Sequence, residues 1–248
     1  MPVFFLAPHP VFGTAKARKP ESYQRRSPYY WWWAYLRRNA DYLECCASGG
    51  QGRLSHLYED FGDVRGDEFR IWWSKDRRGV KLFGEQPLEV KFHELESPSD
   101  WQWGWTKENA MVVVFPLVVS KRRLKGHINR LLDQRHSGKA GRPSLGKVAS
   151  TAKYKLSRNY TIQNLSTMLD VYDLYVANAA LPKEQQMRQW EIGVKLKLNK
   201  RAVKEATSKI QFERTLGRNH LGAVVKRYLV QAQKTIKTLE QGAFPFAK

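Results

Sequence analysis

The chain has 248 residues, of which 42% are hydrophobic and 12% aromatic, and its formal net charge is +20. This length and apolar content predict one large or two small folded domains and exclude a disordered polyelectrolyte. The two cysteines, Cys45 and Cys46, are adjacent, which excludes a disulfide framework; we expect packed thiols in a reducing cytoplasm.

The positive charge is concentrated in the second half of the chain. Residues 1–125 carry 20 Lys and Arg against 15 Asp and Glu, whereas residues 126–248 carry 23 against 8. A half this basic attracts polyanions, of which nucleic acid is the first choice and an anionic membrane the second. The longest apolar run, Ala110–Val119, is too short to cross a bilayer, so we expect a soluble protein with no membrane partner.

Residues 1–27 are predicted to form a basic arm. The opening MPVFFLAPHPVF contains three prolines and no basic leader, so it does not have the pattern of a signal peptide. The following GTAKARKPESYQRRSP is basic and contains proline. Such an arm either contacts phosphate or is a solvated leader.

Tyr29–Cys46, with the sequence YYWWWAYLRRNADYLECC, is the densest aromatic run and is predicted to be a helix. It is either the anchor of the N-terminal core or an aromatic and arginine surface. We favour packing for Trp31–Trp33, which leaves Arg37 and Arg38 as candidate nucleic-acid contacts.

The stretch YWWWAYLRRNADY at residues 30–42 resembles the W-x-F-L-R-R-N-P-x-Y stretch that opens a small transcriptional-regulator-like family of bacterial mobile elements. Ala40 stands where that pattern has proline, and Ala34 where it has an acidic residue. The resemblance covers about a dozen residues. It implies a bacterial or phage mobile-element setting and DNA-linked regulation, and it brings no catalytic residues.

Helical spacing continues over residues 54–61 and 67–74, and residues 28–84 are predicted to form a tryptophan-rich three-helix unit. The period then changes to two, at Leu88–Phe92 and at Trp101–Trp105, before the apolar run 110–119. These segments predict a small antiparallel sheet. The alternating tryptophans either stack nucleic-acid bases or cover a core, and we favour the core.

Residues 121–135 predict a basic amphipathic helix of a size that fits the DNA major groove. The following linker, 136–150, contains Gly-Arg-Pro at 141–143 and resembles the core of an AT-hook, which binds the minor groove. The candidate DNA contacts in these two segments are Arg122, Arg123, Arg130, Lys139, Arg142 and Lys147.

The last hundred residues are predicted to be helical, with a buried stripe from Ile162 to Val176 and a long final helix lined by Leu221–Leu239. The alternation VKLKLNK at 194–200 is either helical or a short strand. Residues 200–215 predict a further basic helix, interrupted at Gly217. The candidate phosphate contacts here are Lys200, Arg201, Lys204, Lys226 and Arg227.

Catalytic signatures are absent: the sequence contains no GxSxG, no Gly-rich phosphate loop, no HExxH and no CxxC pair, and its six histidines lack metal-ligand spacing. We therefore predict no metal, no cofactor and no enzyme activity. One alternative is a Mg²⁺-dependent nuclease that uses Glu89 and Lys91, spaced Glu-x-Lys in a predicted strand.

Together these features predict a predominantly helical α+β protein: a Trp-rich helical N-terminal unit with a small antiparallel sheet, then a basic C-terminal helical domain. The expected divisions are 1–27 (basic arm), 28–135 (aromatic-rich domain), 136–150 (linker) and 151–248 (basic helical domain). The expected function is that of a cytoplasmic double-stranded-DNA-binding regulatory or accessory protein of a bacterial or phage mobile element. DNA is preferred over RNA, and a protein partner or homo-oligomer is compatible with the pattern. A second alternative is a host inhibitor that binds an acidic protein.

Overall fold

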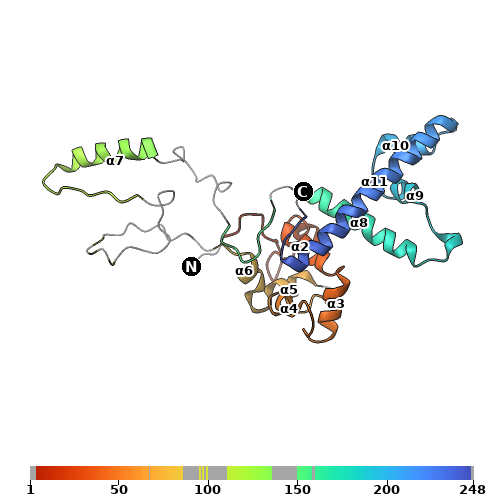
Figure 1. Ribbon diagram of the computed structural model, residues 1–248, viewed down its shortest axis with the longest axis horizontal. Helices are drawn as coiled ribbons and strands as arrows, with labels where there is room; N and C mark the ends of the chain where they lie inside the picture. The colour runs from red at the N-terminus through yellow and green to blue at the C-terminus, as the bar shows by residue number, and fades with distance from the viewer. Residues whose placement is uncertain are drawn as a thin grey trace. The chain divides into compact units, whose positions relative to one another are not determined.

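The computed structural model describes residues 4–66, 68–85, 95, 97, 99, 111–135, 150–157 and 160–246. The chain divides into two compact units, one formed by residues 1–86 together with 150–248, the other by residues 87–149. Of the described residues, 61% are helical (Figure 1).

The first unit contains the N-terminal helices and the C-terminal helices. The N-terminal set is α1 (Glu21–Gln24), α2 (Pro28–Leu36), α3 (Ala40–Ala47), α4 (Ser55–Phe61), α5 (Phe69–Ser74), η1 (Lys75–Arg77) and α6 (Arg78–Phe83). The C-terminal set is α8 (Ile162–Ala179), η4 (Lys183–Gln185), α9 (Gln189–Lys195), α10 (Lys200–Ala206), α11 (Gln211–Thr238) and η5 (Leu239–Gln241).

The predicted antiparallel sheet is wrong: no strand is formed among the described residues, which contain only isolated bridges. Of the apolar run, residues 111–119 are described and form an irregular segment with a turn. Most of their side chains are exposed, with Val114, Leu117 and Val118 at 88%, 91% and 97%, and Pro116 has no N–H for a ladder. The other two predicted strands, 88–92 and 101–105, lie outside the described residues.

The helix predicted over 29–46 is divided into α2 and α3, because Asn39 starts a new helix. Its side-chain oxygen accepts a hydrogen bond from the Tyr42 N–H at 2.9 Å, which caps α3. Ser27 caps α2 in the same way, with Pro28 as the first helical residue. Arg37 and Arg38 therefore lie in the connection between two helices.

Every residue of α2 is buried, as expected of a helix that is hydrophobic on all sides. The predicted packing role of Trp31–Trp33 is confirmed, because these side chains are only 1–3% exposed. The Trp32 ring contacts four other aromatic rings, those of Phe61, Phe83, Tyr154 and Phe244. The last two come from the C-terminal part of the chain, so the aromatic core joins both ends of the sequence.

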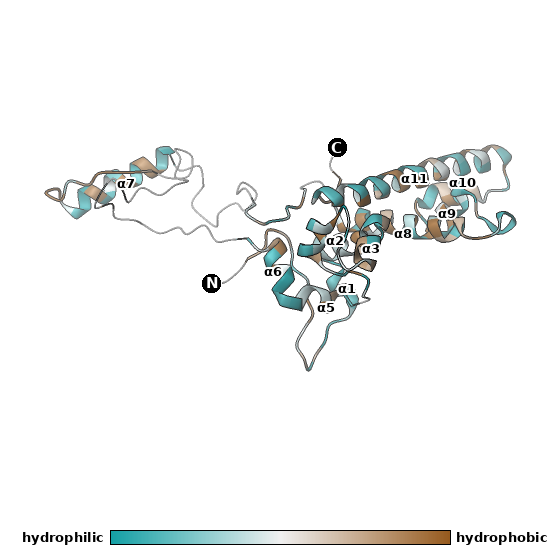
Figure 2. Ribbon diagram, turned by 60° about the horizontal axis from the view of Figure 1, so that its bottom comes forward, coloured by the Kyte–Doolittle hydropathy of each residue, from teal (hydrophilic) through white to brown (hydrophobic). Residues whose placement is uncertain are grey.

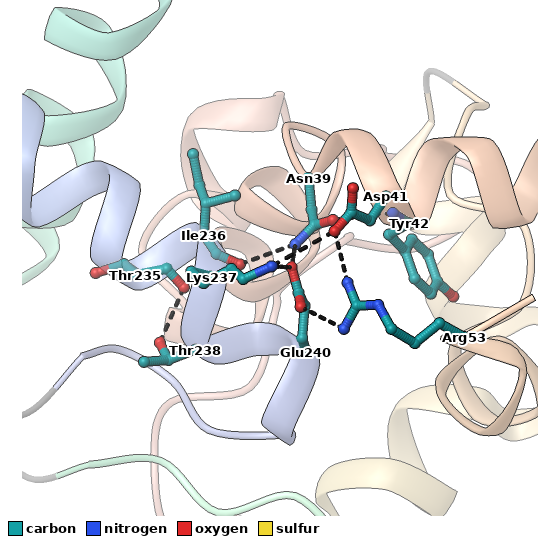
Figure 3. Close-up of polar contacts among 9 residues, drawn as sticks. All are labelled: Asn39, Asp41, Tyr42, Arg53, Thr235, Ile236, Lys237, Thr238 and Glu240. Atoms are coloured by element: carbon teal, nitrogen blue, oxygen red, sulfur yellow. Dashed lines mark hydrogen bonds and ion pairs between the residues drawn. The ribbon is translucent and has the colours of Figure 1, made fainter.

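The N-terminal helices pack against α8 and the C-terminal end of α11 (Figure 1). The Tyr35 hydroxyl donates to the Leu165 carbonyl of α8 at 2.9 Å. Asn39 donates its amide to the Ile236 carbonyl of α11 and to Glu240, each at 3.1 Å (Figure 3). Glu240 also forms ion pairs with Arg53 and Lys237, each with a nitrogen–oxygen distance of 2.8 Å. One buried carboxylate therefore connects α3, the α3–α4 loop and η5.

In the second unit, the structure describes mainly α7 (Lys121–Arg135), the basic helix predicted from the sequence. Apolar and polar residues alternate along it, as Figure 2 shows. Its apolar stripe, Leu124, Ile128 and Leu131, is only partly buried, and none of the helix's residues is fully buried. Its basic side chains face solvent.

Candidate nucleic-acid interface

Helices α9 and α10 are joined by four residues, Leu196–Asn199, and form a helix–turn–helix. The turn begins with Lys197 in the left-handed region, at φ 51°. The Lys197 N–H donates to the Val194 carbonyl at 3.0 Å, and the Leu198 N–H donates to the Gly193 carbonyl at 3.1 Å. These two hydrogen bonds are those of the Schellman motif, which ends many helices. The left-handed residue of this motif is usually glycine, and a lysine is unusual there.

The second helix of the motif starts at a strong cap. The Asn199 side chain accepts a hydrogen bond from the Ala202 N–H at 3.0 Å, which fixes the first turn of α10. At the start of α9, the Arg188 N–H donates to the Glu191 carboxylate at 2.5 Å. Both seven-residue helices therefore have defined ends, which short helices require because they are marginal alone.

The long helix α11 supports both short helices, and two glycines allow the close approach. A Cβ at Gly217 of α11 would lie 2.3 Å from the Ala206 nitrogen and 2.8 Å from the Ala202 carbonyl oxygen of α10. A Cβ at Gly193 of α9 would lie 3.0 Å from Leu221 Cβ. The α10 backbone thus rests directly on α11, and its orientation is set by main-chain contact.

A cation–π contact also connects the motif to α11. The Arg218 guanidinium carbon lies 4.2 Å from the centroid of the Trp190 ring in the first turn of α9. The buried apolar residues between the three helices complete the packing: Ile192, Ala202, Ala206, Leu221 and Val225.

The solvent face of α10 is basic. Lys200, Arg201 and Lys204 are exposed, while Ala202 and Ala206 on the opposite side are buried against α11. Arg201 is 87% exposed and donates through Nε to Oε1 of Glu205 at 2.7 Å. The DNA major groove is wide enough to admit an exposed α-helix with cationic side chains on one face.

Further basic side chains surround the motif. Lys195 ends α9, Lys197 lies in the turn, and Lys226 and Arg227 lie farther along α11; all four are exposed. The structure therefore brings the predicted residues Lys200, Arg201 and Lys204 together on one helix face, and it places Lys226 and Arg227 on the supporting helix.

The other predicted contacts lie elsewhere. Arg122, Arg123 and Arg130 are exposed on α7 in the second unit. The linker residues Lys139, Arg142 and Lys147 lie outside the described residues, as do Glu89 and Lys91 of the nuclease alternative.

Arg37 and Arg38 are both engaged within the protein. Arg37 stacks on the Trp33 ring at 4.7 Å. Arg38 pairs with Asp173 of α8 through two hydrogen bonds, at 2.6 and 3.0 Å, and donates a third to the Ala34 carbonyl at 2.8 Å. Its position is that of a link between α2 and α8.

The helix–turn–helix was not predicted, although its components are present in the sequence. VKLKLNK is not a strand: α9 ends at Lys195, Leu196–Asn199 form the turn, and Lys200 begins α10. The helix predicted over 200–215 is two helices, α10 and the start of α11, and Gly217 lies inside α11 as a contact point. The available signal was the run of spaced apolar residues, Ile192, Leu196 and Leu198, followed by a capping asparagine and basic residues.

The described residues also bear on the requirements of a metal site, a reactive thiol and a membrane span. They contain no group of three His, Cys, Asp or Glu side chains able to hold a metal ion. Burial raises the pKa of both Cys45 and Cys46, which keeps the thiols protonated and fits packed residues. Within the part of the chain that is described, no helix combines the length and apolarity needed to traverse a bilayer.

None of the protein-family models, curated proteins or solved structures compared with the chain matches it.

Proposed function

We propose that this protein binds double-stranded DNA through the helix–turn–helix, with α10 in the major groove. The observation that carries this proposal is the placement of α10: a short capped helix, fixed on α11 by backbone contact at Gly217, that turns Lys200, Arg201 and Lys204 to solvent. A rigid support matters because base edges are read only when the helix orientation is constrained.

The distribution of positive charge also supports double-stranded DNA as the ligand. Phosphate contacts supply most of the affinity of such proteins, and they come from Lys and Arg around the groove-binding helix. Lys195, Lys197, Lys226 and Arg227 are exposed near the motif or along its supporting helix. The net charge of +20 adds long-range attraction to any polyphosphate.

The dimensions of the grooves favour DNA over RNA. The B-DNA major groove admits an α-helix, whereas the major groove of A-form RNA is deep and too narrow for side chains on a helix to read. A helix–turn–helix is therefore suited to duplex DNA, while a purely electrostatic binder would accept both duplexes.

The role we propose is regulatory or accessory, within a bacterial or phage mobile element, as the resemblance of residues 30–42 implies. In this proposal α7, with Arg122, Arg123 and Arg130, and the linker residues Lys139, Arg142 and Lys147 provide additional DNA contacts. Arg38, paired with Asp173, has its main role in packing.

The test is fluorescence anisotropy with three labelled probes of equal length: duplex DNA, single-stranded DNA and duplex RNA. Titrations at two salt concentrations separate phosphate contacts from other binding, because the logarithm of the affinity falls linearly with that of the salt concentration. We expect duplex DNA to bind most tightly, with a steep salt dependence. Equal affinity for all three probes, or no binding of duplex DNA at low salt, would contradict the proposal.

A further inference from the structure

Arg201 and Glu205 lie one helical turn apart on the solvent face and edge of α10. The Arg201 Nε donates to Glu205 Oε1 at 2.7 Å. The two side chains differ sharply in exposure: Arg201 is 87% exposed, whereas Glu205 is only 20% exposed. The carboxylate is therefore the fixed member of the pair, and the guanidinium extends from it into solvent.

The position of Glu205 is set by the contact between α10 and α11. A Cβ at Gly217 would lie 2.7 Å from the Glu205 carbonyl carbon, so the main chain at residue 205 rests on α11. Glu205 lines a groove together with Arg201, Lys204, Thr207, Ser208 and Glu213. Glu205 is thus anchored at the place where the two helices meet.

The hydrogen bond uses only the Nε–H of Arg201. Because the guanidinium is planar, an acceptor held at Nε also fixes the plane in which Nη1 and Nη2 lie. These two nitrogens form an end-on fork with two parallel N–H donors. The matching acceptor pair in the major groove is N7 and O6 of guanine.

We propose that Arg201 reads a guanine in the DNA major groove and that Glu205 is its positioning residue. This inference rests on the proposed function, because it places α10 in the groove. Glu205 touches no base in this arrangement; it acts by favouring one range of orientations of the Arg201 guanidinium.

A base edge suits this pair better than a phosphate does. A carboxylate 2.7 Å from the guanidinium repels an approaching phosphate and offsets much of the cation's charge. Lys200 and Lys204 form no ion pair with other described residues and carry compact ammonium groups, which suit phosphate. On α10, Arg201 therefore contacts a base, and Lys200 and Lys204 on either side of it in the sequence contact phosphates.

The experiment is selection of bound duplexes from a pool with a randomised central segment, followed by sequencing, using the full chain. Four proteins are compared with the wild type: Arg201→Lys, Arg201→Ala, Glu205→Ala and Glu205→Gln. Thermal melting by circular dichroism confirms that each variant is folded, and anisotropy on the unselected pool measures the total affinity.

We expect the wild type to enrich a guanine at one position by about tenfold. Arg201→Ala removes every donor at this position, so it should lose this preference, whereas Arg201→Lys keeps the charge without the fork and should weaken the preference. Glu205→Ala should also lose the preference, and Glu205→Gln should retain most of it, since its amide oxygen still accepts from Nε. A purely structural role of Glu205 would change the melting temperature and leave the base preference intact.

The failures are distinguishable. If the wild type binds the pool without a guanine preference, or if Arg201→Ala keeps that preference, this inference is overturned and DNA binding stands. If the wild type fails to bind the duplex pool at low salt, the proposed function fails, and this inference fails with it.

Discussion

Gly217 and Ala206 bring the main chains of α11 and α10 into direct contact: a Cβ at residue 217 would lie 2.3 Å from the Ala206 nitrogen. Real side chains do not accept such a distance, so any substitution at residue 217 must displace α10. The proposed recognition helix therefore depends on a glycine at the seventh position of a 28-residue helix.

The first prediction concerns this contact. Gly217→Ala should lower the free energy of unfolding by about 1–3 kcal/mol, because overpacking against a backbone outweighs the better helix propensity of alanine. It should also weaken duplex DNA binding by moving α10. Urea unfolding and anisotropy measure the two effects.

Gly222→Ala is the matched control, in the same helix with nothing within 4 Å of its added methyl group. It should be neutral or stabilise by about 0.5–1 kcal/mol, with unchanged DNA affinity. Equal effects of the two substitutions would mean that α10 is not held by the contact at Gly217.

The turn offers a second prediction. Lys197 adopts φ 51°, a conformation that costs an L-residue about 1–2 kcal/mol and costs glycine very little. Lys197→Gly should therefore stabilise the protein by roughly 0.5–1 kcal/mol after the entropy of the glycine is counted.

Lys204→Gly, at an ordinary helical position in α10, is the comparison and should destabilise by about 1 kcal/mol. Chemical denaturation of both variants is sufficient. Destabilisation by Lys197→Gly of the same size would show that the turn does not have this conformation in solution.

The third prediction concerns pH. Burial alone raises the pKa of Glu240, but hydrogen bonds from Lys237, Arg53 and Asn39 outweigh it and lower the pKa to about 2 (Figure 3). A carboxyl group with a depressed pKa in the folded state stabilises the protein above its unfolded-state pKa, which is near 4.5. That stability is lost as the pH falls from there through the folded-state pKa.

Glu240→Gln should therefore cost about 1–3 kcal/mol near neutral pH, and the difference from wild type should shrink at about pH 3. Urea unfolding of both proteins across this range measures it. A difference that stays constant down to about pH 3 would contradict the role of the ionised carboxylate.

Local patterns predicted much of this fold. The stripe from Ile162 and the one ending at Leu239 became α8 and the α11–η5 helix, because a period of 3.6 over many residues has no other common cause. The burial of Trp31–Trp33 followed from their place in the less charged half of the chain.

Other features of the fold cannot be predicted from the local sequence pattern. The Schellman turn at Lys197 lacks the glycine that usually marks it. The end of a helix could therefore not be predicted within the alternating sequence VKLKLNK. The contact between Tyr35 and Leu165 joins residues 130 apart and depends on tertiary packing alone. The apolar run 110–119 predicted a strand, but a strand needs a partner, and residues 111–119 have none among those described.

The most direct test of the central claim compares two double variants on the same duplex DNA probe. Lys200→Ala with Lys204→Ala removes the cations on the exposed face of α10, and Lys75→Ala with Lys81→Ala removes two exposed lysines from η1 and α6. Both lower the net charge equally. We predict that the affinity of the α10 variant falls about tenfold or more. The slope of the logarithm of its affinity against the logarithm of the salt concentration should also become shallower by about two, whereas the control stays near wild type in both quantities. Equal losses in the two variants, or none in the α10 variant, would contradict DNA binding through α10.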